Sequence, residues 1–171
     1  MPCIPTVGFA EECEDGLGGV KLGSLLLTGL SDITTSTIVA GEITVLTQVA
    51  LTNFYNYNIK KESANFVTTM TKENGNQVYE TIVTVSLLKM SAAKNVEFRL
   101  VSSSPTVIIL QDENDLYWCI GLEKGADLNA TVVQTGATMN EMNGYTLTFT
   151  ARSGNAPYTV DPTVVAGLTT A

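Results

Sequence analysis

The side chains that could carry chemistry in this chain are three cysteines and two groups of carboxylates, because the sequence contains no histidine. Without histidine, Ser–His and Cys–His nucleophile pairs and histidine-containing metal sites are excluded. Cys3, Cys13 and Cys119 are odd in number and show no Cys-x-x-Cys spacing. We therefore expect no zinc site and no disulfide within the chain, with Cys119 buried and two incidental terminal thiols. An intermolecular disulfide formed after release from the cell is the alternative.

The carboxylates form two clusters that could bind Ca²⁺ or act as acids and bases. The first consists of Glu11, Glu12, Glu14 and Asp15, and the second is the run 112–115. Neither has the spacing of an EF-hand loop, and nothing partners the first cluster, which surrounds Cys13, for catalysis. We interpret the first as a solvated or interface-facing surface. The second reads as a hairpin turn, whose charges keep it hydrated and oppose edge pairing, with Ca²⁺ binding as the alternative.

No other motif predicts an activity. The glycine-rich run 16–19 lacks the flanking strand, the spacing and the helix of a nucleotide-binding loop. We therefore expect no enzyme activity and no cofactor.

Composition sets the class of protein. The chain has 171 residues, 9 Lys and Arg against 17 Asp and Glu, and a net charge of -8. This balance argues against a nucleic-acid binder with a basic face. With 44% hydrophobic and 15% charged residues, the chain should fold as one domain, and no apolar run is long enough to span a membrane. Residues 1–5 lack the features of a secretory signal, which predicts folding in the cytoplasm.

The elements that must position these residues are mainly strands, because β-branched residues are abundant. Apolar or alternating runs predict strands over 24–30, 42–49, 107–110, 116–122, 127–134 and 145–152, in addition to a long hairpin over 54–88. Ser91 is placed to cap one short helix over 92–101, with Ala93, Val96 and Leu100 facing the core. The fold class expected is mainly β, an antiparallel sandwich or barrel of seven to nine strands.

The hairpin is the most informative segment. Asn74 and Gly75 lie between two strand-like runs, and an Asn-Gly pair favours a type I′ turn. The return strand places Val78 and Ile82 on its second face. That face is too apolar for a solvated surface, which predicts that a second sheet or a neighbouring subunit covers it.

The two ends of the chain read as arms around a body. We assign residues 1–19 to an N-terminal arm, 20–152 to the β-rich body and 153–171 to a C-terminal arm. Pro157 and Pro162 argue against a central strand or a helix in the C-terminal arm. The arm is nevertheless apolar, so we expect it to dock on its own body or on a neighbour. The residues concerned are Tyr158, Val160, Val164, Val165 and Leu168.

The order strand, long hairpin, helix, hairpin, hairpin over residues 20–152 resembles the tail-tube fold of tailed bacteriophages. The segments 116–125 and 143–150 are similar to structural proteins of phages that infect Bacteroidetes, including the crAss-like group. The resemblance implies a virion structural protein that forms homo-oligomeric rings in the tail or head–tail connector. Its partners would be further copies of itself and portal, ring or tail components, and DNA would pass through the lumen without specific binding. The residues expected at the subunit interface are Asn74, Gly75, Val78 and Ile82 of the hairpin and the five apolar residues of the C-terminal arm.

Two other functions fit the same sequence. One is a capsid-associated decoration protein, which particle stoichiometry would distinguish from a ring protein. The other is a carbohydrate-binding β-sandwich, against which a single tryptophan argues, because sugar sites usually stack several aromatic rings.

Overall fold

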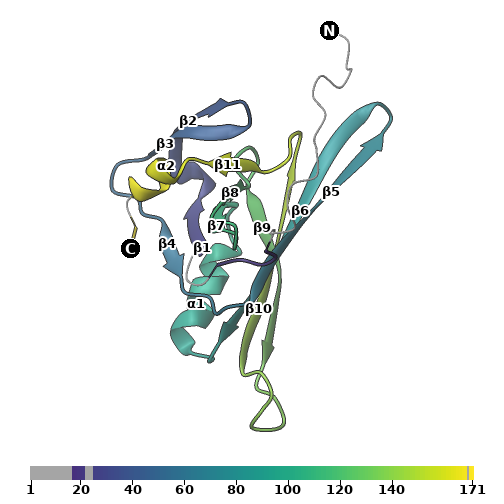
Figure 1. Cartoon of the computed structure of the whole chain (residues 1–171). Helices are drawn as coiled ribbons and strands as arrows, with labels where there is room; N and C mark the ends of the chain where they lie inside the picture. Colours follow the sequence, from purple (N-terminus) through teal and green to yellow (C-terminus); the bar gives the residue numbers. More distant parts are fainter. Residues whose placement is uncertain (1–16, 22–24, 169) are drawn as a thin grey trace.

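The computed structural model describes residues 17–21, 25–168 and 170–171 (Figure 1). These residues form strands β1 to β11, two α-helices and one 3-10 helix. The strands are β1 Leu25–Gly29, β2 Ile33–Val39, β3 Glu42–Gln48, β4 Tyr55–Tyr57, β5 Ala64–Glu73, β6 Asn76–Leu88, β7 Thr106–Gln111, β8 Tyr117–Ile120, β9 Ala126–Gln134, β10 Gly144–Ser153 and β11 Tyr158–Val160. The helices are η1 Leu30–Asp32, α1 Ala92–Val101 and α2 Pro162–Ala166. The predicted mainly-β class is confirmed, but the described residues hold more strands and one more α-helix than expected.

The sheet is folded into two layers, because only the pair Thr106–Ala126 connects β7 to β9. The long sheet has the order β9-β10-β6-β5, and the short sheet has the order β2-β3-β11-β8-β7-β1-β4. In Figure 1 the short sheet and α1 lie on one side of the long sheet. Neighbouring strands are antiparallel except β11 and β3, which are parallel.

Two apolar clusters fill the interior, one on each face of the short sheet. Leu25 and Leu27 of β1 face the first cluster, between the sheets, and Leu26 faces the second. β7 alternates in the same way, with Ile108 in the first cluster and Ile109 in the second. This burial on both faces explains why the two strands read as uninterrupted apolar runs.

The C-terminal segment forms part of the body, which corrects the interpretation of 153–171 as an extended arm. β11 lies between β3 and β8, and α2 follows it directly. Val160 and Leu168 are buried in the second cluster. Pro157 precedes the strand, and Pro162 is the first residue of α2, where its missing N–H is not needed. The inference from the prolines was therefore wrong. Of the two expected docking surfaces, the structure shows the first, because the apolar residues of this segment cover the short sheet of their own chain.

Helix α1 has the predicted bounds but presents a different face. Ser91 caps it, since its Oγ accepts a hydrogen bond from Lys94 N at 3.3 Å. Phe98 is the residue that packs into the core, whereas Val96 and Leu100 are 61% and 60% exposed. Ala93 is exposed as well, so the predicted core face of the helix was wrong.

At the N-terminal end, residues 1–16, with most of the predicted arm and its acidic cluster, lie outside the described residues. Residues 17–21 run along the turn 111–115. Leu17 N donates to Asn114 Oδ1 at 2.8 Å, and Lys21 N donates to Gln111 O at 2.8 Å. This segment is therefore part of the body.

Candidate assembly surface

The β5–β6 hairpin projects beyond the rest of the long sheet (Figure 1). β10 pairs with β6 only as far as Tyr79, so the end of the hairpin has no third strand beside it. All residues from 69 to 78 are exposed. Asn74 and Gly75 have φ of 50° and 83°, the positive values that a type I′ turn requires, which confirms the predicted turn. A two-stranded ribbon is marginally stable alone, so such a projection is suited to contacting another molecule.

The two sides of the projecting hairpin differ. Val67, Val78 and Ile82 lie on the outer side and are 57%, 42% and 41% exposed. The predicted alternation of β6 is therefore confirmed. The opposite side of the hairpin is continuous with the side that faces the core nearer the body. It carries Met70, which is 51% exposed, and Lys72.

Several sheet edges are not covered by other described strands. β5 pairs only with β6, β2 pairs only with β3, and β9 beyond Ala126 pairs only with β10. Ser86 N donates to Ser63 O at 2.7 Å, and the β5–β6 register continues from there without a bulge. The alternation of an antiparallel ladder then directs the N–H and C=O groups of even-numbered β5 residues, such as Thr68 and Met70, to the free edge. β2 holds no charged residue and no proline, the usual devices that block edge pairing.

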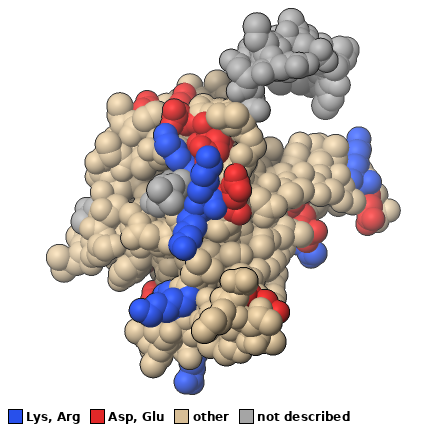
Figure 2. Space-filling view, turned by 60° about the horizontal axis from the view of Figure 1, so that its bottom comes forward, with Lys and Arg blue, Asp and Glu red and all other residues tan. Residues whose placement is uncertain are grey.

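The outer face of the long sheet is rich in hydroxyl groups. Thr146, Thr148 and Thr150 of β10 alternate with the buried residues of that strand. The charges of Glu80 and Arg152 cancel in an ion pair of 2.7 Å. Figure 2 shows the view from below, in which basic and acidic side chains gather in a few places and most of the surface is uncharged.

A groove lies between α1, η1 and the pair β1–β4, with a volume of about 310 Å³. Tyr55, 51% exposed, and Leu100 provide its apolar lining, and Asp32 and Glu97 provide carboxylates. Tyr57 OH donates to Glu97 Oε1 at 2.9 Å. Burial, together with this hydrogen bond, raises the pKa of Tyr57, so its hydroxyl stays a donor across the physiological range.

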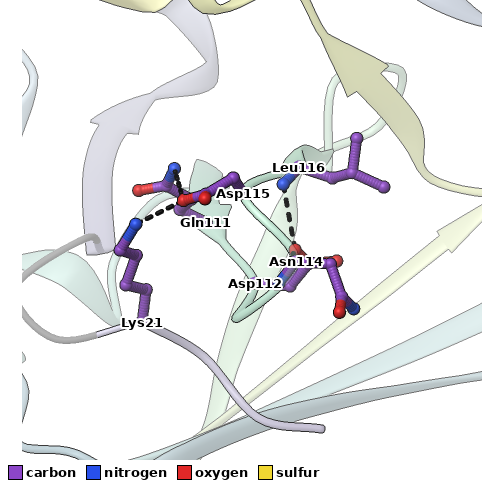
Figure 3. A network of polar contacts seen from close by, with 6 residues as sticks. All are labelled: Lys21, Gln111, Asp112, Asn114, Asp115 and Leu116. Atoms are coloured by element: carbon purple, nitrogen blue, oxygen red, sulfur yellow. Dashed lines mark hydrogen bonds and ion pairs between the residues drawn. The ribbon is translucent and has the colours of Figure 1, made fainter. Parts of the chain in front are cut away.

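The acidic turn 112–115 uses its carboxylates for internal hydrogen bonds (Figure 3). Asp112 accepts from the backbone N–H groups of Asn114 and Leu116, each at 2.9 Å, and from Trp118 Nε1 at 2.9 Å. Asp115 pairs with Lys21, which raises the pKa of that lysine mainly through their hydrogen bond. Across residues 17–21, 25–168 and 170–171, no group of three or more Cys, Asp or Glu could hold a metal ion. The observed contacts favour the interpretation as a turn over Ca²⁺ binding.

Cys119 is buried in the second apolar cluster, as expected. Its removal from solvent raises the pKa of its thiol to about 12. The thiol is therefore neutral and unreactive at physiological pH. Cys3 and Cys13 lie outside the described residues.

One polar cluster was not foreseen from the sequence. Glu123 accepts hydrogen bonds from Asn155 Nδ2 at 2.7 Å, Tyr158 OH at 2.8 Å and Gly154 N at 3.2 Å. Burial would raise the pKa of Glu123, but these three bonds outweigh it and leave the pKa lowered. The cluster attaches the segment that leads into β11 to the turn after β8. No local pattern could have revealed it, because the partners are about thirty residues apart.

The predicted interface residues do not form one surface. Asn74, Gly75, Val78 and Ile82 share the hairpin and are exposed. The remaining predicted residues line or border the second cluster: Tyr158, Val160, Val164, Val165 and Leu168. The hairpin is therefore the part of the predicted interface that remains available to a neighbour.

Comparison of the chain with protein families, with curated proteins and with solved structures gives no match. Among the described residues, no helix is both long and apolar enough to cross a membrane.

Proposed function

We propose that this protein is a structural subunit of a phage virion, which assembles with further copies of itself into a ring in the tail or head–tail connector. The observation that carries the proposal is that the edges of β5 and β2 are open, and that the β5 edge continues into the projecting hairpin. An exposed edge is a template for pairing with a strand of another chain. The partners proposed are other copies and neighbouring virion proteins.

The two edges belong to different strands, which sets the symmetry of the contact. Pairing of β5 on one subunit with β2 on the next is heterologous, and heterologous contacts close into a ring when the rotation between subunits allows it. Ten residues of β5 and seven of β2 are available for such a ladder. Apolar side chains beside the ladder, such as Val67 and Ile38, 57% and 39% exposed, would lose contact with water.

The composition of the long sheet fits a conduit for DNA. Its outer face presents the threonine hydroxyls of β10, the Glu80–Arg152 ion pair and the exposed carboxylate of Asp127 beside Thr150. Nearer the hairpin it also carries the exposed apolar side chains of Val67, Val78 and Ile82. We propose that this face lines the lumen, where the absence of a basic cluster on it lets phosphate groups pass without being held.

The test is a shortened hairpin. The deletion of residues 70–73 and 76–79 leaves Asn74 and Gly75 between Thr69 and Glu80. Thr69 and Glu80 are already cross-strand partners, and they form the same hydrogen-bonded type of pair as Glu73 and Asn76, which flank the turn in the intact protein. The turn and register are therefore retained while the projection is lost. A matched control is Met139→Ser, which removes a fully exposed apolar side chain from the β9–β10 loop.

We expect the intact protein and the control to form rings or short tubes by sedimentation velocity and electron microscopy. The shortened protein should sediment as a folded monomer with unchanged circular dichroism. The proposal is overturned if the intact protein remains monomeric at high concentration, or if the shortened protein assembles equally well.

A further inference from the structure

We propose that the tip of the hairpin docks into the α1–β4 groove of a neighbouring copy, with Met70 as its apolar anchor and Lys72 as its charged contact. This inference rests on the proposed function and specifies the receiving surface.

The hairpin offers a small apolar and basic surface on one side. Met70 and Lys72 are two residues apart on β5, so their side chains point to the same side. Their cross-strand partners on β6 are Tyr79 and Gln77. The two ion pairs among the described residues are Lys21–Asp115 and Arg152–Glu80, and Lys72 belongs to neither.

The groove has the complementary character. Tyr55 and Leu100 are about half exposed or more, although both are large and apolar over most of their surface. Asp32 and Glu97 contribute two carboxylates, and neither lysine nor arginine is among the lining residues. A volume of about 310 Å³ lies at the small end of ligand pockets, a size suited to one or two side chains.

The position of the groove connects it to the proposed edge contact. η1 contributes Ser31 and Asp32 to the groove, and β2 begins at the next residue, Ile33. If β5 of one subunit pairs antiparallel with β2 of the next, the end of β5 at Glu73 lies near Ile33. The tip of the hairpin then reaches the groove of the subunit whose edge it pairs with. One neighbour therefore provides both contacts.

The competing receiving surface within this protein is the outer face of the long sheet. That face is rich in threonine and its one described ion pair is already balanced. That face offers Lys72 the single exposed carboxylate of Asp127, the cross-strand partner of Thr150, whereas the groove offers two carboxylates together with an apolar lining for Met70. The groove is therefore favoured. The two surfaces lie on different elements, which makes them distinguishable by site-specific crosslinking.

The test uses two proteins in a Cys3→Ser, Cys13→Ser background, in which the buried Cys119 is retained and each protein carries one introduced cysteine on its surface. One carries Met70→Cys, and the other carries Leu100→Cys and a mass tag. The two proteins are mixed and mildly oxidised. We expect the main product to be a disulfide-linked dimer of one tagged and one untagged chain. The matched control is Val78→Cys in place of Met70→Cys, because Val78 is exposed on the opposite side of the same hairpin. The control should give at least about tenfold less heterodimer.

A charge variant tests the second contact. Lys72→Glu would place a carboxylate against Asp32 and Glu97, so the concentration for half-assembly should rise by roughly tenfold at low salt, and less at high salt. Lys72→Arg should assemble normally. If rings form but Met70→Cys does not crosslink preferentially to Leu100→Cys, the groove is the wrong receiving surface and the proposed function stands. If no assembly forms at any concentration, both are overturned.

Discussion

Replacement of Val160 by alanine separates a core role for the C-terminal segment from an interface role. Val160 is 2% exposed and lies in β11, between β3 and β8, with Ile43 in the same cluster. The substitution removes two methyl groups, each worth about 0.8 kcal/mol on burial, and leaves a cavity that adds to the loss. We therefore expect the free energy of unfolding to fall by about 2 to 3 kcal/mol.

The assay is urea denaturation at a protein concentration at which the chain is monomeric, so that loss of assembly does not contribute. Thermal denaturation of the same protein should show a midpoint lower by about 4–12 °C for a domain of this size. Val78→Ala is the matched control, because Val78 is 42% exposed on the hairpin. Its effect on stability should stay within about 0.5 kcal/mol.

The refuting result is a Val160→Ala protein as stable as the unchanged chain but defective in assembly. That outcome would mean that β11 is not held in its own sheet in solution, and that the segment serves a neighbour as an arm.

Two further predictions concern one buried and one exposed polar contact. Tyr145 is fully buried and its hydroxyl contacts Ser91 N, Ser91 O and Asn95 Oδ1 at 3.2, 3.1 and 2.6 Å. Tyr145→Phe should therefore cost about 1–3 kcal/mol in urea denaturation, whereas Tyr55→Phe, at a half-exposed ring, should cost little; equal effects would contradict the role of this hydroxyl. Glu123→Gln should lower the free energy of unfolding at pH 7. The pKa of Glu123 is lowered in the folded state, so the ionised carboxylate stabilises the fold at pH values above its unfolded pKa of about 4.3. The difference between Glu123→Gln and the unchanged chain should shrink as the pH falls below about 4, and a difference independent of pH would show that the carboxylate charge is not involved.

Local patterns were sufficient for the parts of the fold that local geometry controls. The Asn74–Gly75 turn requires positive φ at two residues, and few dipeptides allow that, so the hairpin and its register could be predicted. Ser91 supplies a cap that fixes the start of α1. The alternation along β6 fixes which residues face the core, because the side-chain period of a strand is two.

The same patterns failed where a neighbouring element decides. β2 is a run of threonine, serine and β-branched residues that is mostly exposed on both faces, so it shows no alternation and was not predicted. On α1, the apolar residues Val96 and Leu100 suggested the wrong face. Phe98 determines the buried face because its ring packs edge-on against Tyr145 of β10, at 4.9 Å between centroids.

The sequence by itself determined a mainly-β chain with one long hairpin and a capped helix, because each of these depends on residues close together along the chain. The tertiary structure decided the role of the C-terminal segment. β11 has only three residues and gains its stability from β8 and β3, which lie about forty and about 117 residues earlier in the chain. Such a strand has no local signal, since its hydrogen bonds and its buried Val160 exist only once the short sheet has formed. The same step leaves the β5–β6 hairpin exposed, and this is the surface that the proposed assembly uses.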